Sequence, residues 1–261
     1  MTVDLVGLAS ADLAVNGRMR AASNATLQCS FTDQRGVQVD CIYKPISGER
    51  PLWDFPTGTL AHREIATYEL SQLLGWNVVP PTVWRDEGPA GPGMCQLWVT
   101  SNDGEGLVDV VPVGSVPEGW RHVLDANTDD GTAVSLIHAD TDQLKRMAVL
   151  DILVNNADRK GGHILVDAEG HTWGIDHGVT FSPDPKLRTV LWGWADEPID
   201  EHILGDIEGL ASNVVGDIDS IDRWLQDDES VMLRRRISDL LLLRRFPTAT
   251  DDWPAIPWPV F

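Results

Sequence analysis

The sequence is poor in positive charge: 20 Lys and Arg residues stand against 40 Asp and Glu residues, which gives a formal net charge of -20. Such a chain repels the phosphate backbone of nucleic acids and the anionic surface of a membrane. We therefore expect no nucleic-acid partner and no stable membrane association. A small, locally basic site for a nucleotide is still compatible with this charge.

Cysteine is scarce as well, and its three residues form no C-x-x-C pair: Cys29, Cys41 and Cys95. An odd count without paired spacing argues against a disulfide framework or a zinc site and is typical of buried thiols in a reducing compartment. The sequence also lacks the basic start of a signal peptide. It has no apolar run near the roughly 20 residues of a membrane span. We therefore expect a cytoplasmic protein.

What the chain does have is length and apolar content, with 261 residues of which 43% are hydrophobic. This is enough for a sizeable core and fits one two-lobed domain or two small ones. A polar stretch rich in Gly and Asp, followed by Val and Pro, suggests a boundary. We expect a first lobe at residues 1–100, a linker at 101–118 and a second lobe at 119–261.

The first lobe reads as strands followed by one helix. Alternating residues over 26–31 and 37–45 predict an antiparallel pair around a turn, with a further strand before them. Helical spacing predicts a helix over residues 60–74, which Gly75 ends. Lys44 stands near the end of the strand over 37–45, and Glu64 stands early in the helix.

The second lobe reads as mostly helical. We expect helices over residues 133–154, near 199–226 and over 230–245, and a hairpin at 164–175. The last helix has an apolar face and a basic face. It reads either as a membrane-surface helix or, as we favour for so acidic a protein, as a helix packed on the protein with its arginines solvated or paired.

The hairpin brings two acidic loops together, one with Asp158 and one with Asp176. Two carboxylates at the ends of short strands can hold a base and a metal around one phosphate, which is the arrangement of a phosphoryl-transfer site. Taken alone, each Asp is more typical of a turn than of a catalytic site.

The order of these features along the chain resembles that of the protein-kinase-like superfamily. The features are a strand Lys, a helix Glu, an apolar strand, a D-x-x-x-x-H loop and a D-x-G motif. The resemblance is strongest to type II phosphatidylinositol 4-kinases and an actinobacterial PI3/PI4-kinase-like family. It implies an α+β, two-lobed fold, with an antiparallel sheet plus one helix in the N-lobe and a mostly helical C-lobe. It also implies an ATP-dependent phosphotransferase that uses ATP with Mg²⁺ or Mn²⁺.

The resemblance assigns roles to single residues. Lys44 matches the lysine that contacts the nucleotide phosphates, and Glu64 matches its helix partner. Asp158 matches the catalytic base or substrate-orienting carboxylate, and Asp176 matches the metal ligand. The remaining nucleotide contacts fall on the phosphate-covering turn and on the hinge strand: Ser23, Asn24, Gln96, Leu97, Trp98 and Val99.

His163 departs from the family pattern, because it stands where the family has a metal-binding Asn. Imidazole is a nitrogen ligand, whereas Mg²⁺ prefers oxygen. The site therefore takes a metal such as Mn²⁺, or uses one metal through Asp176, or has lost catalysis. Gly161 and Gly162 let a backbone come close to a substrate phosphate, or else form a plain flexible turn.

Three functions remain open. The first is a phosphotransferase whose unknown acceptor is a protein or a small soluble molecule rather than a lipid. The second is a nucleotide-binding pseudokinase or regulatory module, of which His163 would be the mark. The third is a kinase fold that transfers AMP to a protein.

Overall fold

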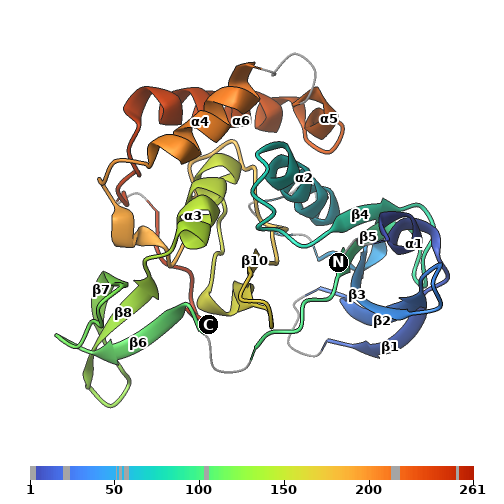
Figure 1. Ribbon diagram of the computed structural model, residues 1–261, viewed down its shortest axis with the longest axis horizontal. Helices are drawn as coiled ribbons and strands as arrows, with labels where there is room; N and C mark the ends of the chain where they lie inside the picture. Colours follow the sequence, from blue (N-terminus) through green and yellow to red (C-terminus); the bar gives the residue numbers. More distant parts are fainter. Residues whose placement is uncertain are drawn as a thin grey trace.

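The computed structural model describes residues 4–19, 24–50, 52, 55, 59–102, 106–212, 218–250 and 253–261. Its fold is α+β and has two parts, with strands β1 to β5 on one side and most of the helices on the other (Figure 1). The hairpin β9–β10 lies between them. The predicted fold class is confirmed.

The first part contains a five-stranded antiparallel sheet in the order β1-β2-β3-β5-β4. The strands are β1 Ala14–Arg18, β2 Leu27–Thr32, β3 Gln38–Pro45, β4 Thr82–Arg85 and β5 Gly93–Leu97. Cys29 lies opposite Cys41 in the register of β2 and β3, and both pack with Cys95 beneath helix α1 (Leu5–Ser10). All three cysteines are free and buried, as the sequence predicts.

Helix α2 (Leu60–Leu73) crosses from the sheet to the helical part. Its end is set by Gly75, whose φ of 70° lies in the left-handed region that favours glycine. The N–H groups of Gly75 and Trp76 return to the carbonyls of Gln72 and Ser71 at 2.9 and 3.0 Å. These two hydrogen bonds form a Schellman motif, which confirms the predicted helix end.

The second part begins with a three-stranded sheet in the order β6-β8-β7. The strands are β6 Val108–Pro112, β7 Trp120–Asn127 and β8 Ala133–Ala139. The helix predicted over 133–154 is therefore wrong in its first half, because residues 133–139 pair with strands on both sides. Strand β6 lies inside the predicted linker at 101–118. The division into lobes stays a prediction.

Helix α3 (Asp142–Val154) begins at Thr141, whose hydroxyl accepts the Leu144 N–H at 3.3 Å. The remaining elements are the hairpin β9 Ile164–Val166 and β10 Thr172–Gly174, the helices α4 Glu201–Ser212, α5 Asp219–Asp222 and α6 Asp227–Leu243, and the 3₁₀ turns η1 Ile46–Gly48, η2 Gly161–His163 and η3 Trp192–Trp194. The largest buried apolar cluster joins α2, α3, α4 and α6.

The basic side of α6 is bound to the protein. Arg234 pairs with Asp219 and Asp222 at 3.0 and 2.6 Å, and Arg236 donates to the Leu153 carbonyl at 2.7 Å. The predicted packing of this helix is therefore confirmed.

Among the described residues, no helix is both long and apolar enough to cross a membrane.

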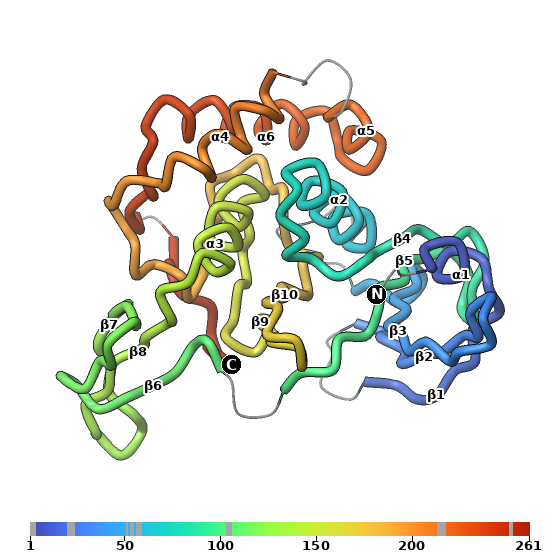
Figure 2. Tube along the Cα trace, in the orientation of Figure 1, coloured from blue at the N-terminus to red at the C-terminus, as the bar shows by residue number. Residues whose placement is uncertain are grey.

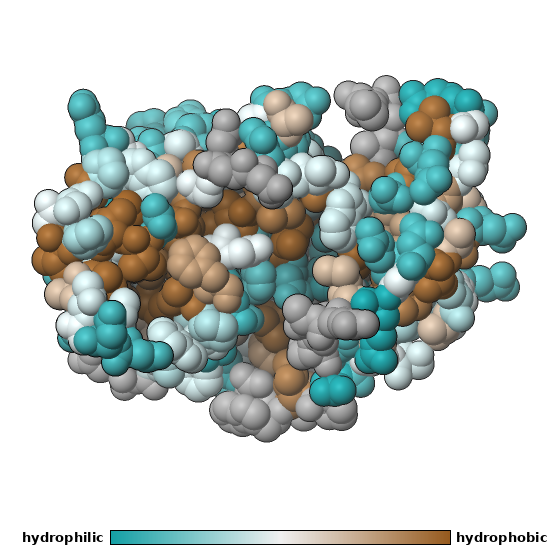
Figure 3. Space-filling model, turned by 90° about the horizontal axis from the view of Figure 1, so that it is seen from below, coloured by the Kyte–Doolittle hydropathy of each residue, from teal (hydrophilic) through white to brown (hydrophobic). Residues whose placement is uncertain are grey.

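The segment at residues 253–261 runs back across the molecule toward β6 and β9 (Figure 2). The Ala255 carbonyl accepts hydrogen bonds from Thr189 N–H at 3.1 Å and Trp192 Nε1 at 2.9 Å. Viewed from below, apolar side chains gather on the side of β6 to β8, and polar side chains line the hollow between the two parts (Figure 3).

Candidate functional site

Three of the predicted site residues meet at one point. The Lys44 Nζ, at the end of β3, lies 2.5 Å from Glu64 Oε1 in the second turn of α2 and 2.9 Å from Asp176 Oδ1 just after β10. Lys44 and Glu64 are largely enclosed, whereas the Asp176 side chain is half exposed. One ammonium group therefore joins the sheet, the helix and the loop after the hairpin.

The charges at this point stabilise one another. Burial alone would lower the pKa of Lys44, but Asp176 and Glu64 outweigh it and hold that pKa above its ordinary value. Lys44, in turn, lowers the pKa of Asp176 well below its usual range. Burial raises the pKa of Glu64, and Lys44 opposes that effect. The site thus keeps a fixed cation next to a fixed carboxylate.

Asp158 and His163 lie on the loop that faces this group. His163 Nε2 is 3.5 Å from Asp176 Oδ2, and Lys160 Nζ is 3.2 Å from Asp158 Oδ2. Burial lowers the pKa of His163, while the nearby carboxylates of Asp176 and Asp158 oppose the shift. Both aspartates lie close enough to His163 to act on it electrostatically, so they share one region, as the sequence predicts.

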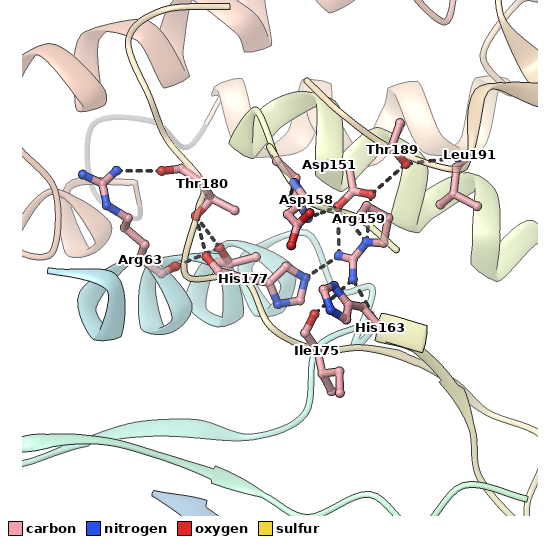
Figure 4. A network of polar contacts seen from close by, with 12 residues as sticks. Arg63, Asp151, Asp158, Arg159, His163, Ile175, His177, Thr180, Thr189 and Leu191 are labelled. Carbon is pink, nitrogen blue, oxygen red and sulfur yellow. Dashed lines mark hydrogen bonds and ion pairs between the residues drawn. The ribbon is translucent and has the colours of Figure 1, made fainter. Parts of the chain in front are cut away.

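A buried guanidinium ties this loop to its surroundings (Figure 4). Arg159 is fully buried, and its Nε and second amino group lie 2.9 Å from the two oxygens of the equally buried Asp151 of α3. It also donates to the carbonyls of His163 at 3.3 Å and Ile175 at 3.1 Å. One side chain therefore fixes the loop with Asp158 against the strand that leads to Asp176.

His177 completes the network as a neutral base. Its Nε2 lies 2.6 Å from the Arg159 guanidinium, which only donates, so this nitrogen must be the acceptor. Burial, and then Arg159, lower the pKa of His177 well below its ordinary value. Its Nδ1 is buried and has no partner among the described residues. His177 therefore helps to place the loop with Asp176 without carrying charge.

The predicted hinge strand is present, but most of its N–H groups already have acceptors. Gln96 lies inside the sheet with its side chain bonded to Thr82 at 2.8 Å. The Leu97 N–H bonds the Pro81 carbonyl at 2.9 Å, and the Trp98 N–H bonds the Asp40 carbonyl at 3.0 Å. The Leu97 and Trp98 N–H groups are therefore engaged within the protein. The nucleotide contacts expected of Gln96, Leu97, Trp98 and Val99 stay predictions.

The turn predicted to cover the phosphates is only partly described. Ser23 lies outside the described residues. The Asn24 side chain accepts the Arg50 N–H at 2.9 Å, which holds the end of this turn to the loop after β3. A nucleotide contact by either residue stays a prediction.

The glycine pair of the loop has a different neighbour from the expected phosphate. The Gly161 N–H donates to the Val260 carbonyl at 2.8 Å. A Cβ on Gly161 would stand 2.6 Å from a ring carbon of Phe261, closer than carbon atoms approach. The glycine thus leaves room for the ring of Phe261 where the 253–261 segment packs on the loop, and a close approach to a substrate phosphate stays a prediction.

The donor set of the site fits a divalent cation. Asp176 supplies an ionised carboxylate, and His163 supplies an uncharged imidazole 3.5 Å away. Glu64 Oε2 is also buried without a partner among the described residues. Carboxylate with imidazole suits Mn²⁺ better than Mg²⁺. A second group, Asp142 with Asp200 and His202, lies at the start of α3 and of α4, and its carboxylates pair with Lys145 and Arg146.

Sequence reasoning did not find the supporting residues. Asp151 could have been noticed as a charged residue within the apolar face of a predicted helix, where burial requires a partner. His177 is the middle residue of the D-x-G motif, a position that the motif leaves unspecified. Arg63 carries no local signal, because its carboxylate partner Glu229 lies on α6.

The fold is protein-kinase-like. It has two parts, an antiparallel sheet, a strand lysine that pairs with a helix glutamate, and two aspartates on neighbouring loops. A solved structure described as hydra Fam20 with sugar matches it at a TM-score of 0.56 and 17% identity, over 93% of this chain and 89% of that one. At this identity the likeness shows the fold alone.

Sequence comparisons give the family. The model for phosphatidylinositol 3- and 4-kinase matches residues 122–201, which include Asp158, His163 and Asp176. Protein Rv2133c of Mycobacterium tuberculosis (strain ATCC 25618 / H37Rv) is 48% identical over 265 residues, covering 97% of this chain and 94% of the relative. Phosphatidylinositol 4-kinase gamma 3 of Arabidopsis thaliana is 36% identical over 77 residues, 26% of this chain and 13% of that protein. The chain belongs to the PI3/PI4-kinase-like family, and this supports a phosphotransferase of the kinase type.

Proposed function

We propose that the protein binds ATP with a divalent cation and transfers the γ-phosphoryl group to an acceptor hydroxyl. The observation that carries this proposal is the convergence of Lys44, Glu64 and Asp176 from three separate elements. Phosphoryl transfer needs mainly positioning and neutralisation of charge, so a few fixed groups suffice.

Each residue has one task in this proposal. Lys44, held by Glu64, places a positive charge over the nucleotide phosphates. Asp158 orients the acceptor hydroxyl and takes its proton as the new bond between oxygen and phosphorus forms. The bond between the γ-phosphorus and its bridging oxygen breaks, and ADP leaves with that oxygen. Lys160, next to Asp158, adds positive charge on the side of the transferred group.

Asp176 and His163 are the residues that would hold the cation. When bound, the cation would neutralise phosphate charge and orient the phosphates. In the present structure Lys44 occupies one oxygen of Asp176, so nucleotide binding must move the ammonium toward the phosphates.

The acceptor we favour is a protein or a small soluble molecule. The net charge of -20 opposes approach to an anionic lipid surface. The free, buried cysteines fit a cytoplasmic location.

A nucleotide-binding module without transfer is the second candidate, and His163 at the position of the family's Asn supports it.

Thermal shift with ATP and Mg²⁺ or Mn²⁺ tests nucleotide binding, which both candidates share. We expect the melting temperature to rise by several degrees when ATP exceeds its Kd about a hundredfold. An unchanged melting temperature with both metals would reject both candidates.

A further inference from the structure

Arg63 is the residue before Glu64, and its side chain contacts a different part of the protein. Successive helical residues do not share a face, so Glu64 reaches the sheet while Arg63 reaches the helical part. The Arg63 side chain is buried, and its second amino group forms an ion pair with Glu229 of α6. The two neighbouring side chains thus hold α2 from both sides.

The same guanidinium also reaches the stretch after Asp176. Its first amino group donates to the Thr180 carbonyl at 2.6 Å, as Figure 4 shows. The Thr180 hydroxyl in turn donates to the His177 carbonyl at 2.8 Å. Arg63 therefore links α2, the start of α6 and the loop that carries Asp176.

Glu229 is itself fixed in place. It is the third residue of α6, and its Oε2 accepts the Gln226 N–H at 3.0 Å in a capping box. One carboxylate oxygen caps α6 and the other binds Arg63. The guanidinium is therefore bound by a carboxylate that is fixed at the start of a helix, not by a mobile surface carboxylate.

We propose that the ion pair between Arg63 and Glu229 positions α2 so that Glu64 holds Lys44 for nucleotide phosphates. The predicted effect of the pair on ATP binding rests on the proposed function. Its predicted effect on the position of α2 does not. Arg63 and Glu229 act through Glu64 and touch no substrate, so they are positioning residues. A purely structural pair would stabilise the fold without a selective effect on phosphate binding.

The test compares three variants. Glu229→Gln keeps the capping box, which accepts Gln as well as Glu, and removes the charge that holds Arg63. Arg63→Met is the second variant, since it keeps most of the side-chain length. Arg223→Ala is the matched control, because Arg223 pairs with Glu69 of the same helix at an exposed site, at 2.6 Å.

The first readout is backbone hydrogen exchange over residues 60–66 without nucleotide. We expect exchange in Glu229→Gln and Arg63→Met to be roughly tenfold faster than in the wild type, because the opening of α2 is local. Arg223→Ala should match the wild type. Unchanged exchange in folded Glu229→Gln and in folded Arg63→Met would overturn the proposal.

The second readout is affinity for ATP and for adenosine, with the same cation. If the pair acts through Glu64 and Lys44, ATP binding weakens about fivefold or more, whereas adenosine, which lacks phosphates, binds as before. Equal weakening of both ligands would contradict a positioning role. If the wild-type protein binds no ATP, the proposed function fails, and the exchange measurement alone decides the role of the pair.

Discussion

Lys44 and Asp176 are 132 positions apart in the sequence, yet Lys44 Nζ lies 2.9 Å from Asp176 Oδ1. The contact joins the last residues of β3 to the loop after β10. It thereby ties the five-stranded sheet to the hairpin through one ion pair. The Asp176 backbone, with a φ of 61°, is in the left-handed region, which Asp tolerates better than most residues.

Replacing Lys44 by Met should weaken ATP binding about tenfold or more. The change removes the phosphate contact and leaves Glu64 buried without its counterion, so stability also falls. Calorimetric titration with ATP and Mn²⁺ measures the affinity. Lys145→Met is the control, because Lys145 forms a partly exposed pair with Asp200 away from the site. Equal ATP affinity in the two variants would remove Lys44 from the site.

Replacing Asp151 by Asn should lower the free energy of unfolding by about 3 kcal/mol or more. The Arg159 guanidinium would then be buried without a negative partner. Urea unfolding measures this loss. The exposed pair of Arg235 and Asp239 gives the comparison: Arg235→Met should cost no more than about 0.5 kcal/mol. Similar losses at both sites would show that the buried network does not hold the loop.

Stability should fall with acidification because of His138. This imidazole is buried, its Nε2 accepts the Gly193 N–H at 3.0 Å, and burial lowers its pKa to about 4. The unfolded chain takes up this proton near pH 6.5, whereas the folded chain does not. The free energy of unfolding should therefore fall from about pH 6.5 to about pH 4, by up to about 1.4 kcal/mol per pH unit.

The variant His138→Gln isolates that contribution. It should be less stable than the wild type at neutral pH, with a shallower loss of stability between about pH 6.5 and about pH 4. Urea unfolding at half-unit steps gives both curves. Parallel curves for the two proteins would mean that His138 titrates alike in the folded and unfolded states.

Replacing His163 by Asn should change the preference between metals. An amide oxygen suits Mg²⁺ better than an imidazole nitrogen does. The ratio of ATP turnover, or of ATP affinity, with Mg²⁺ to that with Mn²⁺ should therefore rise by severalfold. A ratio equal to that of the wild type would show that His163 does not bind the cation.

Much of the site followed from the order of residues along the chain. The family pattern named Lys44, Glu64 and Asp176, and the structure brings these three together. Gly75 as a helix end and the hairpin around residues 164–175 were readable because each depends on local chemistry. The roles of these residues remain predictions.

The errors have physical causes as well. Residues 134–137 form a short, mostly apolar stretch, and such stretches do not distinguish a strand from a buried helix. Pairing with β6 and β7 settles it as β8. The contact of Phe261 with Gly161 and the pair of Arg63 with Glu229 depend on tertiary packing, for which the sequence carries no local signal.

The central claim is phosphoryl transfer with Asp158 as the base, and turnover of γ-labelled ATP tests it most directly. Wild type and Asp158→Asn are compared with Mg²⁺ and with Mn²⁺, and ATP affinity is measured in parallel. We predict turnover by the wild type and a loss of about 100-fold or more in the variant, with ATP affinity unchanged. Turnover retained in Asp158→Asn, or ATP binding without turnover by the wild type, would contradict the claim.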